Sequence, residues 1–221
     1  MNYLRKPFVY SYFRAAFAIV LINVALHFLF QIFGVNRAVF ALNVVGFVYS
    51  HYFWQVVSYM FVHGDMSHLF FNMLALLIFG TAIERTVGSK EFLLMYFVIG
   101  IGSGLFSLGV YYGFGRFLMV NGVRPWTFYI SLIGASGAIY GLLFAYAVLF
   151  PKSIIYIWGL IPVPAPLMVL GYAVIEFVSQ FVGSSNVAHM THLAGFAFAW
   201  LYFVIRMGVH PVRIWKDAYR R

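Results

Sequence analysis

Apolar residues fill long stretches of this chain, and short polar segments separate them. A helix needs about 20 mostly apolar residues, roughly 17 to 25, to cross a bilayer. We expect a membrane helix over each of six stretches: residues 14–33, 65–83, 91–112, 133–150, 166–182 and 190–208. The pattern predicts an all-α, polytopic membrane protein in which residues 1–221 form a single six-span domain with short tails at both ends.

The connecting segments differ in character. Residues 34–64 are too long and too aromatic for a solvated linker, so we expect them to lie in the membrane interface. Three prolines in residues 161–166 (IPVPAP) should prevent a helix from running through, and the fifth span then begins near Pro166. Residues 183–189 (GSSNVAH) are small and polar, which predicts a mobile connection.

Composition supports membrane insertion and narrows the chemistry. The chain is 64% hydrophobic and only 9% charged, whereas a soluble domain is about a quarter charged. The absence of cysteine excludes disulfides, a thiolate nucleophile and cysteine-ligated metals. The net charge of +9 is spread around the apolar stretches rather than gathered in one patch, so we expect no nucleic-acid partner.

The basic residues predict the orientation of the spans. Eleven lie in segments expected on one side: Arg5, Lys6, Arg14, Arg85, Lys90, Lys152, Arg206, Arg213, Lys216, Arg220 and Arg221. Three lie in segments expected on the other side: Arg37, Arg116 and Arg124. Because loops rich in Lys and Arg stay in the cytoplasm, we expect both termini there. The expected location is a bacterial cytoplasmic (inner) membrane.

Four polar residues stand inside or at the edge of the expected spans, where polar groups are costly and therefore functional candidates. His68 and Asn72 are four residues apart, which places them on one helix face. Ser136 begins the fourth span and His192 the sixth. In the predicted topology all four lie near the outer ends of their helices, so they can form one site.

A serine and a histidine suggest nucleophilic chemistry. A neutral imidazole close to a hydroxyl can remove its proton and make it a nucleophile. For His192 to reach Ser136, the fourth and sixth spans must approach closely. Stripes of small residues permit this, and they occur on both spans: Gly137, Gly141 and Ala145 on one, Gly195 and Ala199 on the other.

Other side chains can complete such a site. Tyr140 lies one turn after Ser136, where its ring could support the imidazole. The side chains of His68 and Asn72, with the free backbone N–H at the start of the fourth span, could bind an oxyanion. None of the five carboxylates is evidently placed beside His192, and Glu176 has no assigned role, so we expect a Ser/His dyad and not a triad.

The motifs together resemble those of the rhomboid intramembrane serine proteases. They are H-x-x-x-N (His68, Asn72), G-x-S-G (Gly134 to Gly137) followed by Tyr140, H-x-x-G (His192 to Gly195) and G-x-x-x-E-x-x-x-G (Gly80, Glu84, Gly88). The resemblance implies Ser136 and His192 as the catalytic dyad and His68, Asn72 and Ser136 around the oxyanion. It adds Gly134, Gly137, Gly195 and Tyr140 as supporting residues. The family often has Trp-Arg in the first loop, whereas Gln55 follows Trp54 here.

The expected function is therefore an intramembrane serine endopeptidase. Its partners would be single-span or multi-span membrane proteins, cleaved in or beside a transmembrane segment, and the bilayer; no cofactor and no metal is expected. One alternative is a catalytically silent rhomboid-like factor that binds membrane proteins, and another is a small transporter. A metalloprotease would need ligands among His63, His68, His189 and His192, but H-E-x-x-H is absent from the sequence.

Overall fold

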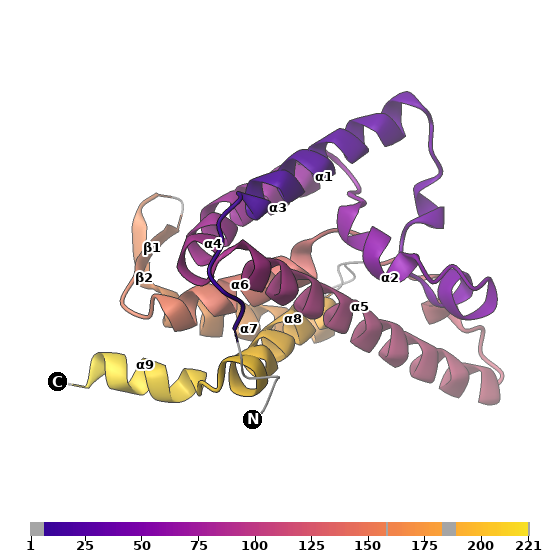
Figure 1. Cartoon of the computed structure of the whole chain (residues 1–221). Coiled ribbons are helices and arrows are strands. Elements are labelled where there is room, and N and C mark those ends of the chain that lie inside the picture. The colour runs from indigo at the N-terminus through magenta and orange to yellow at the C-terminus, as the bar shows by residue number, and fades with distance from the viewer. Residues whose placement is uncertain (1–6, 158, 183–188, 221) are drawn as a thin grey trace.

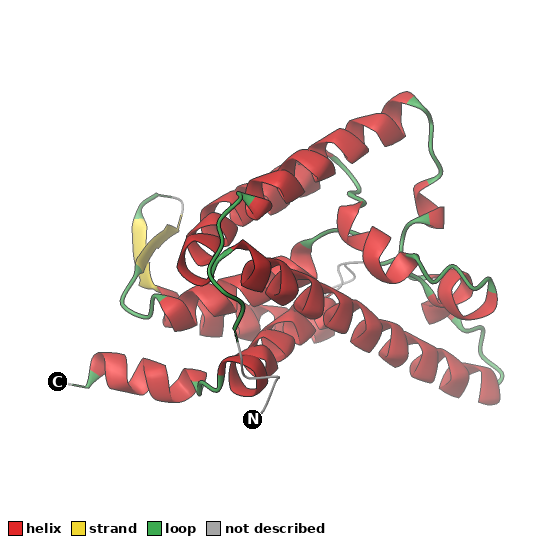
Figure 2. Cartoon of the chain, in the orientation of Figure 1, coloured by secondary structure: helices red, strands yellow, loops and turns green. Residues whose placement is uncertain are grey.

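The computed structural model describes residues 7–157, 159–182 and 189–220. Within this part of the chain, four helical segments are long and apolar enough to cross a membrane: Ala15–Ile32, Met66–Val87, Ser89–Val120 and His189–Met207. Two shorter apolar helices, Ser136–Leu149 and Ala165–Phe181, stand at the other two expected spans. Figure 2 shows that helices make up most of the molecule, so the predicted all-α membrane fold is confirmed.

The long helices follow the chain in order (Figure 1). Helix α1 is Ala15–Ile32; α3 (Met66–Ala75) continues through the π-helical turn η5 (Leu76–Gly80) into α4 (Thr81–Val87). Helix α5 is Ser89–Val120, α6 is Ser136–Leu149 and α7 is Ala165–Val182. Helix α8 (His189–Tyr202) continues into the π-helical η7 (Phe203–Met207). The expected polar connection at 183–188 lies outside the described residues.

Helix α6 is the centre of the bundle. Ten of its fourteen residues are buried, because α5, α7 and α8 pack around it. A helix that is apolar on every face is expected in an interior. Helices α1 and α3 form a separate layer that α5 crosses in Figure 1. The central position of α6 places the start of that helix, and Ser136 with it, among several neighbouring helices.

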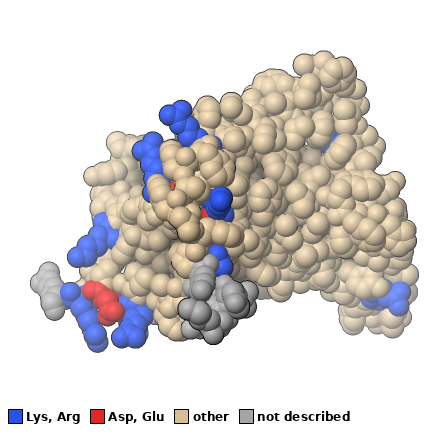
Figure 3. Space-filling model, in the orientation of Figure 1, with Lys and Arg blue, Asp and Glu red and all other residues tan. Residues whose placement is uncertain are grey.

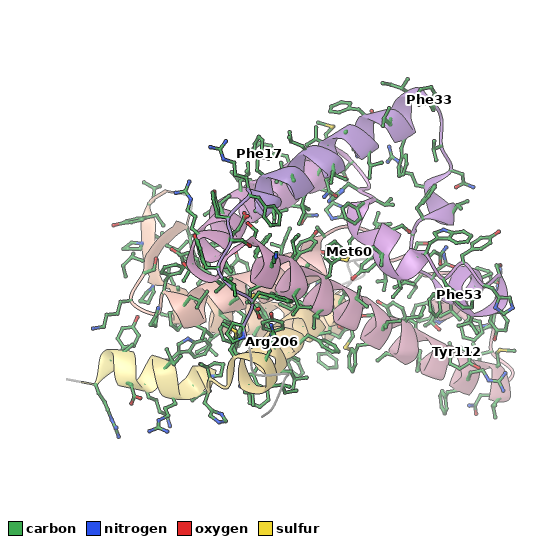
Figure 4. All side chains as sticks on the ribbon, in the orientation of Figure 1. Phe17, Phe33, Phe53, Met60, Tyr112 and Arg206 are labelled. Carbon is green, nitrogen blue, oxygen red and sulfur yellow. The ribbon has the colours of Figure 1, made fainter. Side chains whose placement is uncertain are left out.

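Two buried glutamates fix the end of the bundle where the described chain begins. Glu84 accepts hydrogen bonds from the backbone N–H groups of Ala15 (2.6 Å) and Ala16 (3.0 Å), and so caps the first turn of α1. Glu91 pairs with Arg206, with both N–O distances 2.9 Å. These contacts are structural and belong to the end opposite the aromatic first loop, as Arg206 and Phe53 show in Figure 4.

The segment 34–64 folds into short helical turns: η2 (Arg37–Val39), η3 (Val45–Tyr49), α2 (Gln55–Ser58) and η4 (Tyr59–Phe61). Gln55 is buried, and its amide donates to the Val39 carbonyl at 3.2 Å, which Trp54 Nε1 also reaches at 3.0 Å. The Gln55 amide thus makes hydrogen bonds within the loop at the position where the rhomboid proteases, which the motifs resemble, often have arginine. The segment also pairs with the chain before Ser136, through reciprocal backbone hydrogen bonds between Leu42 and Leu132.

Some elements were not expected. Strands β1 (Ile154–Ile157) and β2 (Ile161–Pro164) form an antiparallel hairpin between α6 and α7. The prolines do stop a helix, as predicted, but residues before proline favour extended backbone, which allows a strand. Helix α9 (Pro211–Tyr219) follows η7, and Trp215 Nε1 anchors it by donating to the Ala147 carbonyl at 2.9 Å. A further short turn, η6 (Trp126–Tyr129), lies after α5.

Candidate active site

Ser136 and His192 lie within hydrogen-bond distance across the α6–α8 contact. His192 Nε2 is 2.9 Å from Ser136 Oγ. Ser136 is the first residue of α6, and His192 is in the first turn of α8. His192 is 8% exposed and Ser136 is partly exposed, so this polar pair lies largely within the bundle. The distance is the one a serine nucleophile and its base require.

The imidazole of His192 lies against an aromatic ring. The Tyr140 ring stacks on it, with ring centroids 4.2 Å apart and planes 5° from parallel. The neighbouring Thr191 shares a 2.8 Å hydrogen bond with Ser107 and so ties the first turn of α8 to α5. The predicted support by Tyr140 is therefore present in the structure, and α5 adds a brace that sequence reasoning did not find.

Glycines bring α6 and α8 together. A Cβ on Gly195 would overlap the Gly137 carbonyl oxygen, and one on Gly141 would lie 2.9 Å from the Gly195 carbonyl oxygen. Backbone therefore meets backbone, and even alanine would force the helices apart. The close approach predicted from the small-residue stripes is confirmed, and it explains how a side chain of α8 reaches Ser136.

His68 and Asn72 lie beside the segment that precedes Ser136. Gly134 has φ +101°, a backbone conformation that favours glycine, and a Cβ there would meet His68 Nε2 at 2.6 Å and Asn72 Nδ2 at 3.3 Å. Asp65 accepts from the His68 backbone N–H at 2.8 Å and caps α3. The structure thus brings all four polar candidates to one place.

Asn72 has an unusual property at this site. It is buried, and its Nδ2 has no hydrogen-bond partner among the described residues. An unsatisfied buried donor costs about 1–3 kcal/mol and is uncommon in folded proteins. A donor left free beside a candidate nucleophile is available to a ligand oxygen.

The structure corrects one expectation from the sequence, which was that no carboxylate lies beside His192. Glu176 lies there. Glu176 Oε1 lies 3.0 Å from His192 Nδ1, and Oε2 lies 2.6 Å from His189 Nδ1. The Tyr140 hydroxyl also donates to the carboxylate. Sequence reasoning missed this contact because the face of α7 that points inward depends on packing. The available signal was the carboxylate itself, alone in an apolar span.

Three side chains here have the chemistry of metal ligands. Glu176, His189 and His192 each offer one ligand atom, and these atoms lie within 4.8 Å of one another. Two histidines and a glutamate form the protein ligands of some catalytic zinc sites. However, the 2.6 Å Glu176–His189 contact is a hydrogen-bond distance, shorter than about 3.3 Å between ligands placed tetrahedrally around zinc. The geometry as it stands fits shared protons better than a metal.

His63 is a further polar residue near the site, and it precedes α3. It is buried, its ring lies 5.1 Å from that of His68, and neither ring nitrogen has a partner among the described residues. Burial, followed by the nearby His68, lowers the pKa of His63 to about 3. His63 is therefore neutral at physiological pH and adds no positive charge beside His68.

The bundle also has an apolar groove on its outside, which is separate from this site. It has a volume of about 230 Å³ and is lined by side chains of α5 and α8: Phe106, Met190, Leu193, Ala194, Ala197 and Phe198. Its lining contains no ionisable group. The chemistry of the molecule is therefore gathered around Ser136 and not in this groove.

Several known proteins are similar to this chain in sequence. The chain is 30% identical over 148 residues to Rhomboid protease AarA of Providencia stuartii, over 62% of this chain and 51% of that protein. It is 31% identical over 145 residues to Putative rhomboid protease YdcA of Bacillus subtilis, over 64% and 61%. It is 30% identical over 155 residues to RHOMBOID-like protein 12, mitochondrial, of Arabidopsis thaliana, over 65% and 44%.

The matched region of this chain thus spans between 44% and 61% of the length of these three relatives. The family model described as the Rhomboid domain matches residues 50–208, which include every candidate residue from His68 to His192. This integral membrane chain therefore belongs to the rhomboid family.

Proposed function

We propose that the chain is an intramembrane serine endopeptidase. The observation that carries the proposal is the 2.9 Å contact between His192 Nε2 and Ser136 Oγ inside an apolar bundle. The relatives named as rhomboid proteases support it. The site has a nucleophile, a base and free donors together, which neither a helix contact nor a transport path requires.

In the proposed reaction, Ser136 Oγ attacks the carbonyl carbon of the scissile peptide bond. His192 Nε2 takes the hydroxyl proton as the new C–O bond forms, and the carbonyl electron pair moves onto oxygen. His192 then gives this proton to the leaving nitrogen as the C–N bond breaks. Water repeats the sequence on the acyl-enzyme, with His192 again as the base, and releases the carboxylic acid and free Ser136.

The oxyanion formed in each step needs hydrogen-bond donors. Asn72 Nδ2, which has no partner among the described residues, and the His68 ring lie beside Gly134, two residues before Ser136. The backbone N–H at the start of α6 adds another donor, because the first N–H groups of a helix have no partner within it. We assign His68, Asn72 and the Ser136 backbone to this role.

We propose that the substrates are membrane proteins with one or several spans. Backbone in a regular transmembrane helix has its hydrogen bonds already made, so a scissile carbonyl becomes accessible only where the helix is weakened. Substrates should therefore carry helix-destabilising residues near the cut. The proposed location is a bacterial cytoplasmic membrane, with the site opening to the outer face and residues 1–221 acting as one domain.

The test is incubation of the purified protein with a tagged transmembrane reporter that carries a glycine near its outer end. The wild-type protein should cleave it, whereas Ser136→Ala and His192→Ala should not, at unchanged melting temperature. Retained cleavage in either variant would contradict the proposal. Reporter binding without any cleavage by the wild type would instead favour the silent membrane-protein binder.

A further inference from the structure

Glu176 is the one buried carboxylate that faces the proposed dyad. It lies toward the C-terminal end of α7, is 5% exposed, and directs both carboxylate oxygens at α6 and α8. Oε1 lies near His192 Nδ1 and accepts from the Tyr140 hydroxyl, while Oε2 lies near His189 Nδ1. Among the described residues, the polar contacts of this carboxylate are thus with the imidazole of His192 or with a residue beside it.

An ionisable side chain inside a span is costly, so it is a functional candidate by default. Neighbouring residues of α7 such as Val174, Ile175 and Phe177 are exposed on the outside of the bundle and apolar. An apolar residue at position 176 would also join α7 to the bundle. A carboxylate adds two properties that an apolar residue lacks. It carries a negative charge, and it can accept a hydrogen bond from His192.

We propose that Glu176 is a positioning residue that completes a Ser136–His192–Glu176 triad. It holds the proton of His192 on Nδ1, which leaves the Nε2 lone pair free to accept the Ser136 proton. It also stabilises the imidazolium formed by that transfer. This inference rests on the proposed serine protease function and departs from the dyad that the family resemblance implies.

The proton balance is straightforward. Before attack, His192 carries one proton on Nδ1; after attack it carries a second on Nε2, taken from Ser136, and Glu176 stays ionised. The positive ring then lies beside the negative carboxylate in a medium of low dielectric, where the attraction is strong. When His192 passes the Nε2 proton to the leaving nitrogen, the starting state of the ring returns.

The geometry fits a resting state of this triad. His192 Nδ1 is within ion-pair distance of Oε1, at 3.0 Å, but lacks the alignment of a full hydrogen bond. Catalytic hydrogen bonds are often poorly aligned without substrate and tighten in the reacting complex. The Tyr140 ring, parallel to the imidazole, holds its plane.

The test compares Glu176→Gln with Glu91→Gln. Glu91 is a matched control, because it is also buried, also accepts from a tyrosine hydroxyl (Tyr202) and also forms an ion pair (Arg206). Tyr202 follows His192 by ten residues, about 15 Å along the helix, so Glu91 lies far from Ser136. The readouts are the melting temperature, kcat and KM on the reporter, and the rate at which a fluorophosphonate labels Ser136.

The amide of Glu176→Gln can donate to Nδ1 and so favours the wrong imidazole tautomer. We expect kcat to fall by roughly 10²- to 10⁴-fold, as for the equivalent change in other serine proteases, with KM little changed. Labelling of Ser136 should slow in parallel, and Glu176→Asp, which keeps the charge, should recover part of both rates. Glu91→Gln should lower the melting temperature and leave kcat of the folded protein unchanged.

Three results would overturn the inference. The first is a Glu176→Gln protein with wild-type kcat and a lowered melting temperature, which would make the residue a structural tether. The second is a Glu176→Asp protein no better than Glu176→Gln. The third is loss of wild-type activity in EDTA that Zn²⁺ restores, which would assign Glu176, His189 and His192 to a metal. Cleavage by Ser136→Ala would instead defeat the proposed function itself.

Discussion

At the scale of single residues, Asn72 gives the sharpest prediction. Its Nδ2 is buried without a partner among the described residues, so removing it should not destabilise the fold. Loss of one oxyanion donor typically lowers kcat by about 10²- to 10³-fold. We therefore expect Asn72→Ala to retain its melting temperature and a measurable residue of activity, with kcat reduced by that factor.

Asn23 provides the control for this prediction. It is also a buried asparagine in a membrane helix, but its Nδ2 donates to the Ile19 carbonyl at 2.8 Å. Asn23→Ala should lower the melting temperature and spare kcat. If Asn72→Ala behaved the same way, Asn72 would be an interhelical contact, worth on average about 0.6 kcal/mol in membranes, and its oxyanion role would be refuted.

The same scale shows what the sequence could predict about the site. Ser136, His192, His68 and Asn72 could be found because each is polar within an apolar stretch and stands at the same end of its helix. The contact of Glu176 with His192 could not be found, because it depends on the rotation of α7 about its axis. That rotation is fixed by packing against α6 and α8, which the apolar sequence of α7 does not encode visibly.

At the scale of elements, the α6–α8 contact leads to a prediction about Gly195. Alanine is ordinarily the better helix former, by about 0.5–1 kcal/mol over glycine. At Gly195, however, the added Cβ would overlap the Gly137 carbonyl oxygen. We expect Gly195→Ala to lower stability, by about 1–3 kcal/mol, because packed interiors tolerate extra volume poorly. It should also reduce kcat, because His192 lies one turn earlier in α8.

Gly109 is the matched site for this comparison. It lies inside α5, and a Cβ there would meet nothing within 4 Å. Gly109→Ala should therefore leave stability unchanged or raise it, with normal activity. Thermal unfolding and kcat of the two variants, measured side by side, decide the matter. A Gly195→Ala protein as stable and active as Gly109→Ala would show that the helices do not meet through this glycine.

The elements themselves were predicted to different degrees. The long helices follow from the apolar stretches, and the start of α7 at Ala165, next to the expected Pro166, follows from the prolines before it. Helix α5 runs to Val120, eight residues past the expected 112, because its sequence stays compatible with helix after the apolar density falls. The β1–β2 hairpin and α9 rest on tertiary contacts such as Trp215 to Ala147, which a pattern of single residues does not contain.

At the scale of the whole molecule, charge is unevenly distributed. In Figure 3 the basic side chains gather on the side where α9 lies, and most of the remaining visible face carries none. Helix α9 itself carries Arg213 and Lys216. Ser136 begins the helix whose other end, at Leu149, leads to Lys152, so the candidate site lies at the opposite end of the bundle.

This asymmetry predicts which face of the membrane the site opens to. Loops rich in Lys and Arg remain in the cytoplasm, so α9 should be cytoplasmic, and the turn between α5 and α6 should lie outside. The chain has no cysteine, so single cysteines can be introduced without background: Ala218→Cys in α9 and Val123→Cys after α5. In intact cells an impermeant maleimide should label Val123→Cys only, and both variants should react once detergent dissolves the membrane. The reverse pattern would place Ser136 at the cytoplasmic face, and substrates would then have to present their weakened helix end from the cytoplasm.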